Sequence, residues 1–407
     1  MLTLGKHGVG LAILSVVFAP SLVLLSLNTD SLAAGQISAV LIIYFMSFSI
    51  ICFKPLRAFF SWSAMLQMSV AIILLFIHYY ISGFFVNLSQ DHIRFFWTVL
   101  SISIFPPAAY IVANSLIQLA NKDVRNLISS VFYILLINGI ISLTGIDFFS
   151  TGLNKPTFLF AEPSNFAVIS APFIIYYIKL RLVGWQSALI VFLSYAIVIE
   201  NLTMLLVVFI TFMVCFQLKK LLLLLPFLVV IFLSFANLDY FFSRLIYSPD
   251  ETDNISLVVL LTGWQNALLS LSSTSGWGVG FQQFGIASPS GELTEKLIEL
   301  NGSNLNSLNG GSTGSKLVGE FGVFGIIMIL ILIARAKRAF SDLRLGNNMT
   351  DLFVFLKCVE IAILIELFVR GLGYFTPGIF TYLIVIYSYK LIGDKLGSKN
   401  SSRKVTV

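Results

Sequence analysis

The sequence predicts an all-α, polytopic membrane protein, and three observations support that fold class. Of the 407 residues, 57% are hydrophobic and only 11% are charged, whereas soluble domains are usually about 45–50% apolar and about 25% charged. The apolar residues form runs near the length that a helix needs to cross a bilayer, about 20 residues. The basic residues lie in short loops between these runs, so the net charge of +6 reflects membrane topology and does not indicate nucleic acid binding.

Twelve apolar runs are predicted as spanning helices. The seventh and eighth are short and are separated only by Glu200, Asn201 and Leu202, so one long broken helix, and eleven spans in total, is the alternative. The predicted spans are residues 9–27, 34–53, 62–82, 95–119, 125–145, 164–181, 185–199, 203–218, 221–236, 316–335, 353–370 and 374–391.

The basic residues favour twelve spans with both termini in the cytoplasm. In that topology, 18 of the 25 Lys and Arg residues lie on the cytoplasmic side, six lie on the outer side, and Lys357 is inside the eleventh span. Cytoplasmic loops carry such an excess of positive charge. Merging the seventh and eighth spans would move Lys219 and Lys220 to the outer side. The first run has no small-residue cleavage site and is interpreted as a retained span.

This topology divides the chain into four parts. Residues 1–236 hold nine spans, residues 237–315 form a long outer loop, residues 316–391 hold the last three spans, and residues 392–407 form a cytoplasmic tail. Within the loop, apolar residues at near-helical spacing predict a helix over Ile255–Leu271 that lies on or near the membrane. The glycine- and asparagine-rich segments that follow predict turns, or mobile loops over a site.

Cysteine and histidine give no sign of a metal centre or of a disulfide framework. The three cysteines lie in or at the edge of apolar spans, and His7, His78 and His92 are scattered. The cluster Asp250–Asp253 is a weak candidate for a divalent ion and is better explained as a solvated turn. No metal and no cofactor are therefore predicted.

Charged residues gather near the outer ends of the predicted spans, and such residues usually mark function or a tight ion pair. Glu162 precedes Pro163, which suits the first turn of a helix. Glu162 is therefore either a helix cap or a carboxylate at the mouth of a cavity, kept ionised by the helix dipole. Ser164 and Asn165 are expected to bond the freed backbone groups of the same turn.

Two arginines, Arg244 and Arg370, also allow both a structural and a functional interpretation. Arg244 is either an interfacial arginine or a clamp for phosphate, which a guanidinium binds through two parallel hydrogen bonds. Arg370 follows Glu366 by four residues, so the two are expected to form an ion pair within one helix, and an incompletely satisfied Arg370 would also bind an anion. Lys357 and Glu360 have a similar spacing and are interpreted as structural. The role of Glu200 is left open, with a buried partner of a lysine or arginine as one option.

Four segments give the chain a resemblance to the bacterial O-antigen polymerases, which are related to the O-antigen ligases. They are FAEPSNFA ahead of the sixth span, FFSRLIYSPDETDNIS followed by LTGWQNAL, GWGVGFQQFG, and NGGSTGSKLVGEFGVFG, which leads into the tenth span. Together, the order of these segments and the predicted topology extend the resemblance over nearly the whole chain. Ligases of this group typically have a histidine near the last segment, and its absence here favours polymerase over ligase.

The resemblance implies a GT-C-type glycosyltransferase of the bacterial inner membrane with its active site facing the periplasm. It would transfer a growing glycan from undecaprenyl pyrophosphate onto a lipid-linked repeat unit, without a metal. Carried over to this chain, Arg244 and Glu162 are the catalytic candidates. The base remains open between Glu162, Glu320, Asp250 and Glu251. A ligase that uses lipid A-core, or a flippase or other transporter of lipid-linked oligosaccharides, is the alternative function.

The same resemblance sets the expected ligands and partners. The substrate is an undecaprenyl-pyrophosphate-linked oligosaccharide, the surroundings are membrane lipid, and a polysaccharide chain-length regulator is the expected protein partner. The residues expected to bind the substrate are Arg370, Lys155, Ser164, Asn165, Asn254, Lys316 and Glu320.

Overall fold

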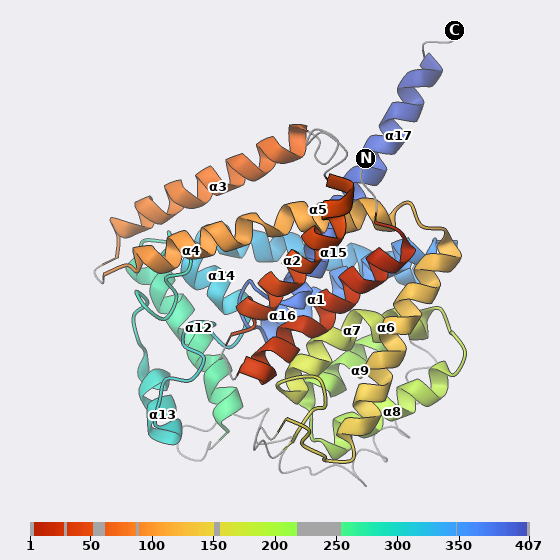
Figure 1. The fold of residues 1–407 in the computed structure, drawn as a ribbon. Helices are drawn as coiled ribbons and strands as arrows, with labels where there is room; N and C mark the ends of the chain where they lie inside the picture. The colour runs from red at the N-terminus through yellow and green to blue at the C-terminus, as the bar shows by residue number, and fades with distance from the viewer. Residues whose placement is uncertain are drawn as a thin grey trace.

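The computed structural model describes residues 4–27, 31–51, 62–86, 89–149, 155–217, 254–346 and 348–404 of the chain. Over these residues the structure is helical and contains no strand, which confirms the all-α prediction (Figure 1). The helices are α1 (Lys6–Leu27), α2 (Ala33–Ile51), α3 (Trp62–Gly83), α4 (His92–Ser103), α5 (Phe105–Leu116), α6 (Asn121–Ser142), α7 (Pro163–Lys179), α8 (Trp185–Val198), α9 (Leu202–Cys215), α12 (Ile255–Ser273), α13 (Glu292–Asn301), α14 (Thr313–Phe321), α15 (Val323–Leu345), α16 (Asp351–Phe368) and α17 (Pro377–Lys404).

Several of these helices could cross a membrane, as expected of a multi-pass membrane protein. Five stretches in the described part of the chain are long and apolar enough: Lys6–Leu27, Met65–Gly83, His92–Leu116, which joins α4 and α5, Asn121–Ser142 and Ile255–Ser273. Three shorter apolar helices are Ala33–Phe48, Trp185–Val198 and Leu202–Cys215. The predicted span at 221–236 lies outside the described residues. The count of twelve spans stays a prediction.

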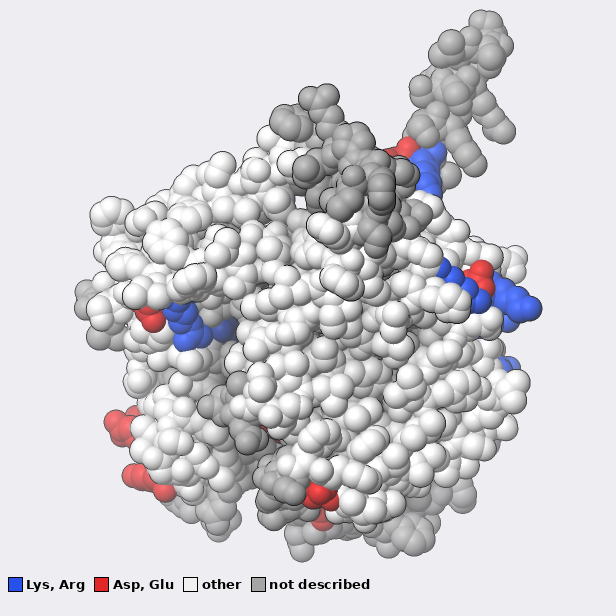
Figure 2. Space-filling view, in the orientation of Figure 1, with Lys and Arg blue, Asp and Glu red and all other residues white. Residues whose placement is uncertain are grey.

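The molecular surface fits a lipid environment. On the face shown in Figure 2, charged side chains lie near the edges, and a wide surface without them lies between. Large apolar side chains on α2 and α3 are exposed, among them Phe45, which is 79% exposed, and Leu66, which is 57% exposed. Such exposure would be unusual for a contiguous patch on a soluble monomer.

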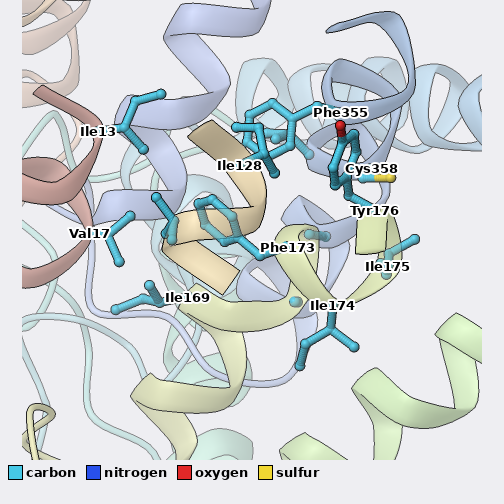
Figure 3. Packing of buried hydrophobic residues seen from close by; sticks show 14 of the residues in the cluster. Ile13, Val17, Ile128, Ile169, Phe173, Ile174, Ile175, Tyr176, Phe355 and Cys358 are labelled. Atoms are coloured by element: carbon cyan, nitrogen blue, oxygen red, sulfur yellow. The ribbon is translucent and has the colours of Figure 1, made fainter. Parts of the chain in front are cut away.

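The core is centred on α7, which is buried along most of its length. Phe173 and Tyr176 pack against Phe355 of α16, with ring centroids 5.4 and 5.9 Å apart. Figure 3 shows Ile13 and Val17 of α1 beside this layer. Because α7 and α16 pack closely, the N-terminus of α7 and the C-terminus of α16 are brought together, and these two ends carry Glu162 and Arg370.

The seventh and eighth predicted spans are separate helices. The chain breaks at Glu200, which has a positive φ of 54°, and Asn201 then caps α9 by accepting a hydrogen bond from the Met204 N–H (3.1 Å). The helices α8 and α9 pack against each other, so the single broken helix is excluded.

The tenth predicted span, 316–335, requires a correction. Gly322 divides it into the nine-residue α14 and the longer α15, which runs on to Leu345. Gly322 has a φ of 56°, and a Cβ atom there would overlap with the Gly276 carbonyl, so only glycine fits this joint. The predicted boundary at residue 316 therefore falls within α14. Similarly, α17 continues beyond residue 391.

Two of the glycine-rich segments pack against each other at this joint. The backbone N–H groups of Val279 and Gly280 donate to the carbonyls of Gly319 and Glu320, at 2.9 and 3.0 Å. The predicted helix over 255–271 is present as α12, and α12, α13 and α14 lie together at one edge of the molecule (Figure 1). Its placement on or near the membrane stays a prediction, because α12 is also long and apolar enough to cross a membrane. The turns predicted after α12 are also present.

Ion pairs join helix ends that the sequence analysis assigned to the same side. Lys6 of α1 pairs with Asp123 of α6 (2.6 Å), and Arg125 of α6 pairs with Asp351 of α16 (2.6 Å). Farther along α16, Glu360 accepts from Arg335 and from Lys357, so the structural interpretation of the Lys357–Glu360 spacing is confirmed. The predicted outer residues Glu162, Lys155 and Arg370 lie at the opposite helix ends.

Candidate functional site

Glu162 is bound by an arginine and does not cap its own helix. It stands at the N-cap position of α7 in an extended conformation, but its side chain makes no capping hydrogen bond. Instead, its Oε2 accepts from Arg370 Nη2 (2.6 Å) and from the Ser164 hydroxyl (3.1 Å). The helix-cap interpretation is therefore wrong, and Ser164 holds the carboxylate rather than a backbone group.

The expected ion pair between Glu366 and Arg370 within one helix also requires correction. Helix α16 ends at Phe368, and the backbone N–H of Arg370 bonds to the Ile365 carbonyl (3.1 Å) in a closing turn. Arg370 is thus in the connector between α16 and α17, residues 369–376, where the four-residue spacing no longer places it over Glu366. Its guanidinium is directed to Glu162 instead.

A small polar cavity lies beside this arginine. Most of its wall is apolar and comes from α7, the start of α17, Leu32 and Leu372; it is called the polar cavity because Asn165, Glu366, Arg370 and Thr376 complete the wall. The Arg370 Nε–H is buried and has no hydrogen-bond partner in the described part of the structure. Because Nη2 is held by Glu162, the guanidinium is fixed while its buried Nε–H stays unpaired among the described residues. Buried donors are nearly always paired, so an unpaired one on an arginine that lines a cavity is a candidate contact for an anionic ligand.

An apolar cavity adjoins the polar one. Its walls come from α1, α7, α16 and α17, and include Val17, Ile169, Phe173 and Ile363, the first three of which are labelled in Figure 3. Glu366, Pro377 and Gly378 line both cavities. The combined site is therefore amphipathic, with hydrogen-bond donors at one end and hydrocarbon at the other. Each cavity has a volume of about 20 Å³, room for about one water molecule, so the two mark an amphipathic seam between α7, α16 and α17 that a ligand with a polar head and an apolar chain would have to widen.

A second polar cluster surrounds Glu320 and Lys316, whose side chains are 0% and 2% exposed. The Lys316 ammonium lies 3.7 Å from the Glu320 carboxylate and donates to the Leu308 carbonyl (2.7 Å). The Tyr374 hydroxyl donates to Glu320 Oε2 (2.8 Å).

The connector joins these two clusters. Arg370 contacts Glu162, Tyr374 contacts Glu320, and Gly371 donates its backbone N–H to the Gly311 carbonyl (3.2 Å). The segment therefore links the start of α7 to the glycine-rich segment before α14. Sequence reasoning did not identify Tyr374 or Thr376, although the run Gly-Leu-Gly ahead of Pro377 could have indicated an irregular segment here.

The remaining predicted site residues are less central. Lys155 pairs with Glu200 (2.6 Å), and because the Glu200 side chain is 23% exposed, this is a partly exposed pair and not a buried one. Asn254 caps α12 by accepting from the Leu257 N–H (3.3 Å), which is a structural role. The polar cavity includes Asn165 but is not lined by Lys155, Asn254, Lys316 or Glu320.

Some predicted residues cannot be placed in the site. Arg244, Asp250, Glu251 and Asp253 lie outside the described residues, and the role of Arg244 stays a prediction. Over the described part of the chain, no group of three or more His, Cys, Asp or Glu side chains could hold a metal ion.

Comparison with known proteins adds no assignment. The chain matches no family model, no curated protein and no solved structure.

Proposed function

We propose that the protein is a GT-C-type glycosyltransferase with twelve spans, which polymerises O-antigen or a related surface polysaccharide. It would transfer a growing glycan from undecaprenyl pyrophosphate onto a lipid-linked repeat unit at the periplasmic face of the bacterial inner membrane. The observation that carries this proposal is Arg370 at the amphipathic site: the residue lines the polar cavity, which adjoins an apolar one, and its buried Nε–H has no hydrogen-bond partner among the described residues.

The chemistry of the transfer fits this arrangement. The leaving group is a lipid pyrophosphate, so negative charge develops on phosphate oxygens as the glycosidic bond breaks. A guanidinium fixed before the reaction stabilises that charge without reorganisation, and more strongly in a dry cavity than in water. Glu162 supplies the fixing contact. Arg244 is proposed as a second clamp, and the metal-free mechanism remains part of the proposal.

A transporter of lipid-linked oligosaccharides is the second candidate, and Glu366 is the observation that favours it. This carboxylate is 2% exposed within the helix bundle. Carboxylates in such positions serve as proton relays in many carriers. Transporters usually also have helices broken near the middle of the bilayer, in repeated halves, and no such repeat is evident in the sequence. We therefore place the polymerase first.

The experiment that tests the function combines deletion of the gene with reconstitution of the purified protein. A deletion strain should produce lipopolysaccharide with a single repeat unit, and purified protein in liposomes should form polymer from lipid-linked repeat units. Unsubstituted core with accumulated lipid-linked polymer would indicate a ligase instead. Lipid-linked units that accumulate facing the cytoplasm, with no polymer formed in liposomes, would indicate a transporter.

The proposed topology gives a separate prediction. A reporter fused after residue 290 is expected on the periplasmic side and one fused after residue 400 in the cytoplasm, because 18 of 25 basic residues lie on the predicted inner side. Alkaline phosphatase and green fluorescent protein fusions measure this directly. A fluorescent fusion after residue 290 would contradict the topology and the side on which the site is proposed to open.

A further inference from the structure

Helix α16 carries two buried carboxylates whose surroundings differ. Both Glu360 and Glu366 are 2% exposed. Glu360 accepts from Arg335 (2.8 Å), from Lys357 (3.3 Å) and from the Tyr389 hydroxyl. Glu366 accepts from the Thr376 hydroxyl. None of the ion pairs among the described residues includes it, although buried charges are usually paired. The difference indicates that Glu366 is not there to balance a structural cation.

The N-terminus of α17 holds the Glu366 carboxylate in place of a cation. Thr376 donates to Glu366 Oε1 while its own oxygen accepts from the Ile379 N–H (3.2 Å), so one hydroxyl caps the helix and binds the carboxylate. Glu366 Oε2 lies against Gly378, where a Cβ atom would overlap with it. The dipole of a helix N-terminus favours a negative charge. An anion stabilised in this way, without a cationic partner, remains able to accept a proton.

The position of Glu366 places it where the reaction would occur. It lines both the polar and the apolar cavity, and it shares the polar cavity with Arg370. Among the described residues that line the two cavities, the other charged group is Arg370 of the connector, which carries Glu162 of the start of α7 as its ion-pair partner. From α1 and the first turns of α17, the lining residues that the structure describes are uncharged. A ligand whose phosphates bind Arg370 would bring its reacting carbon next to Glu366.

We propose that Glu366 is the general base of the transfer, an inference that rests on the proposed function. The Glu366 carboxylate takes the proton of the acceptor sugar hydroxyl as its oxygen attacks the anomeric carbon of the donor. The bond from that carbon to the pyrophosphate oxygen breaks, and the lipid pyrophosphate leaves with the electron pair, facing Arg370. The proton then passes from Glu366 to water. Glu162 is a positioning residue, because its carboxylate holds the guanidinium.

The test measures binding and transfer separately in purified, reconstituted protein. Glu366→Gln keeps the shape and the hydrogen bond from Thr376 but cannot accept the proton. We expect its transfer rate with lipid-linked repeat units to fall about 10²–10⁴-fold. Its affinity for undecaprenyl pyrophosphate, used alone as the binding probe, should stay within threefold. Glu360→Gln on the same helix is the matched control, because it alters a carboxylate outside both cavities, and it should transfer within severalfold of wild type.

A second variant tests a property that a purely structural role would not change. Thr376→Val keeps the volume but removes the hydrogen bond that favours the charged carboxylate. Its acid limb in the pH–rate profile should therefore move to higher pH, whereas Glu360→Gln should leave the limb in place. An unmoved limb in Thr376→Val would refute the assignment even if Glu366→Gln failed to accumulate.

The outcomes separate this inference from the proposed function. If wild-type protein forms no polymer in liposomes, the proposed function fails first. If wild type is active and Glu366→Gln transfers within threefold of it, Glu366 is not the base. If Glu366→Gln is inactive because it no longer binds undecaprenyl pyrophosphate, the residue has a binding role, and the assignment as base is again overturned.

Discussion

The Arg370→Lys variant is expected to be produced and inserted normally, yet to transfer glycan about 10²–10³-fold more slowly than wild type. Arg370 uses Nη2 to bind Glu162 (2.6 Å), lines the polar cavity and keeps a buried Nε–H that is unpaired among the described residues. An ammonium is a point charge, so a lysine that binds Glu162 cannot also place a second, fixed donor in the cavity. Polymer length on a lipopolysaccharide gel and the rate in liposomes both measure the effect.

The same substitution at Arg125 is the matched control for this prediction. Arg125 also binds a carboxylate, Asp351, through Nε (2.6 Å) and Nη2 (3.1 Å), but at the opposite helix ends. Arg125→Lys should therefore change transfer by no more than severalfold. Near-normal polymer from Arg370→Lys would remove Arg370 from the site. Equal losses in both variants would show that the effect is structural.

This expectation for Arg370 differs from the one that the sequence supports. A four-residue spacing to Glu366 suggests that part of the arginine's charge is already neutralised, so that substitution would be mild. The structure instead ends α16 at Phe368 and turns Arg370 toward Glu162, 208 positions away in the chain. Spacing predicts a contact only while the helix continues. Gly371 and Gly373 were the signal that the helix stops, because glycine is common just after a helix C-terminus.

The sequence predicted the helices well because each depends on a local property. Apolar runs of sufficient length and the polar break at Glu200 and Asn201 were enough to locate α1 to α3, α6 to α9 and α16 within a few residues, whereas the single predicted span 95–119 is divided at Ile104 into α4 and α5. The joint at Gly322 was missed because α14 and α15 form one continuous apolar pattern. That joint depends on a close approach to Gly276, 46 positions earlier, which no local pattern shows.

The site was predictable only in part, for the same reason. Glu162 and Arg370 were found because charge near a predicted helix end is unusual. Their pairing depends on how α7 packs against α16, which is a tertiary property. Glu366 was missed because the local explanation, an ion pair with Arg370, was sufficient. The Glu366 carboxylate is held by the start of α17 and not by a cation. That contact depends on the path of the connector, which no local pattern in the sequence shows.

The second large effect is expected on stability, at the buried pair Lys316 and Glu320. Lys316→Met leaves the Glu320 carboxylate, which is 0% exposed, without its cation. Removing one member of a buried pair typically costs about 3–5 kcal/mol, because an uncompensated charge stays behind. Glu320→Gln should also destabilise, since it strands the Lys316 ammonium. Each single variant should have a lower free energy of unfolding in detergent micelles, measured by denaturant titration.

The double variant Lys316→Met with Glu320→Gln decides whether charge is the cause. It removes both charges at nearly constant volume and keeps an oxygen that can accept from the Tyr374 hydroxyl. Replacing a whole buried pair is often close to neutral, so the double variant should recover most of the loss. Asp123→Asn is the control, because its pair with Lys6 is 33% and 46% exposed and should contribute less than about 1 kcal/mol. If the losses in the free energy of unfolding add up in the double variant, the two side chains stabilise the protein by separate contacts. The link between α14 and the connector would then not depend on their charges.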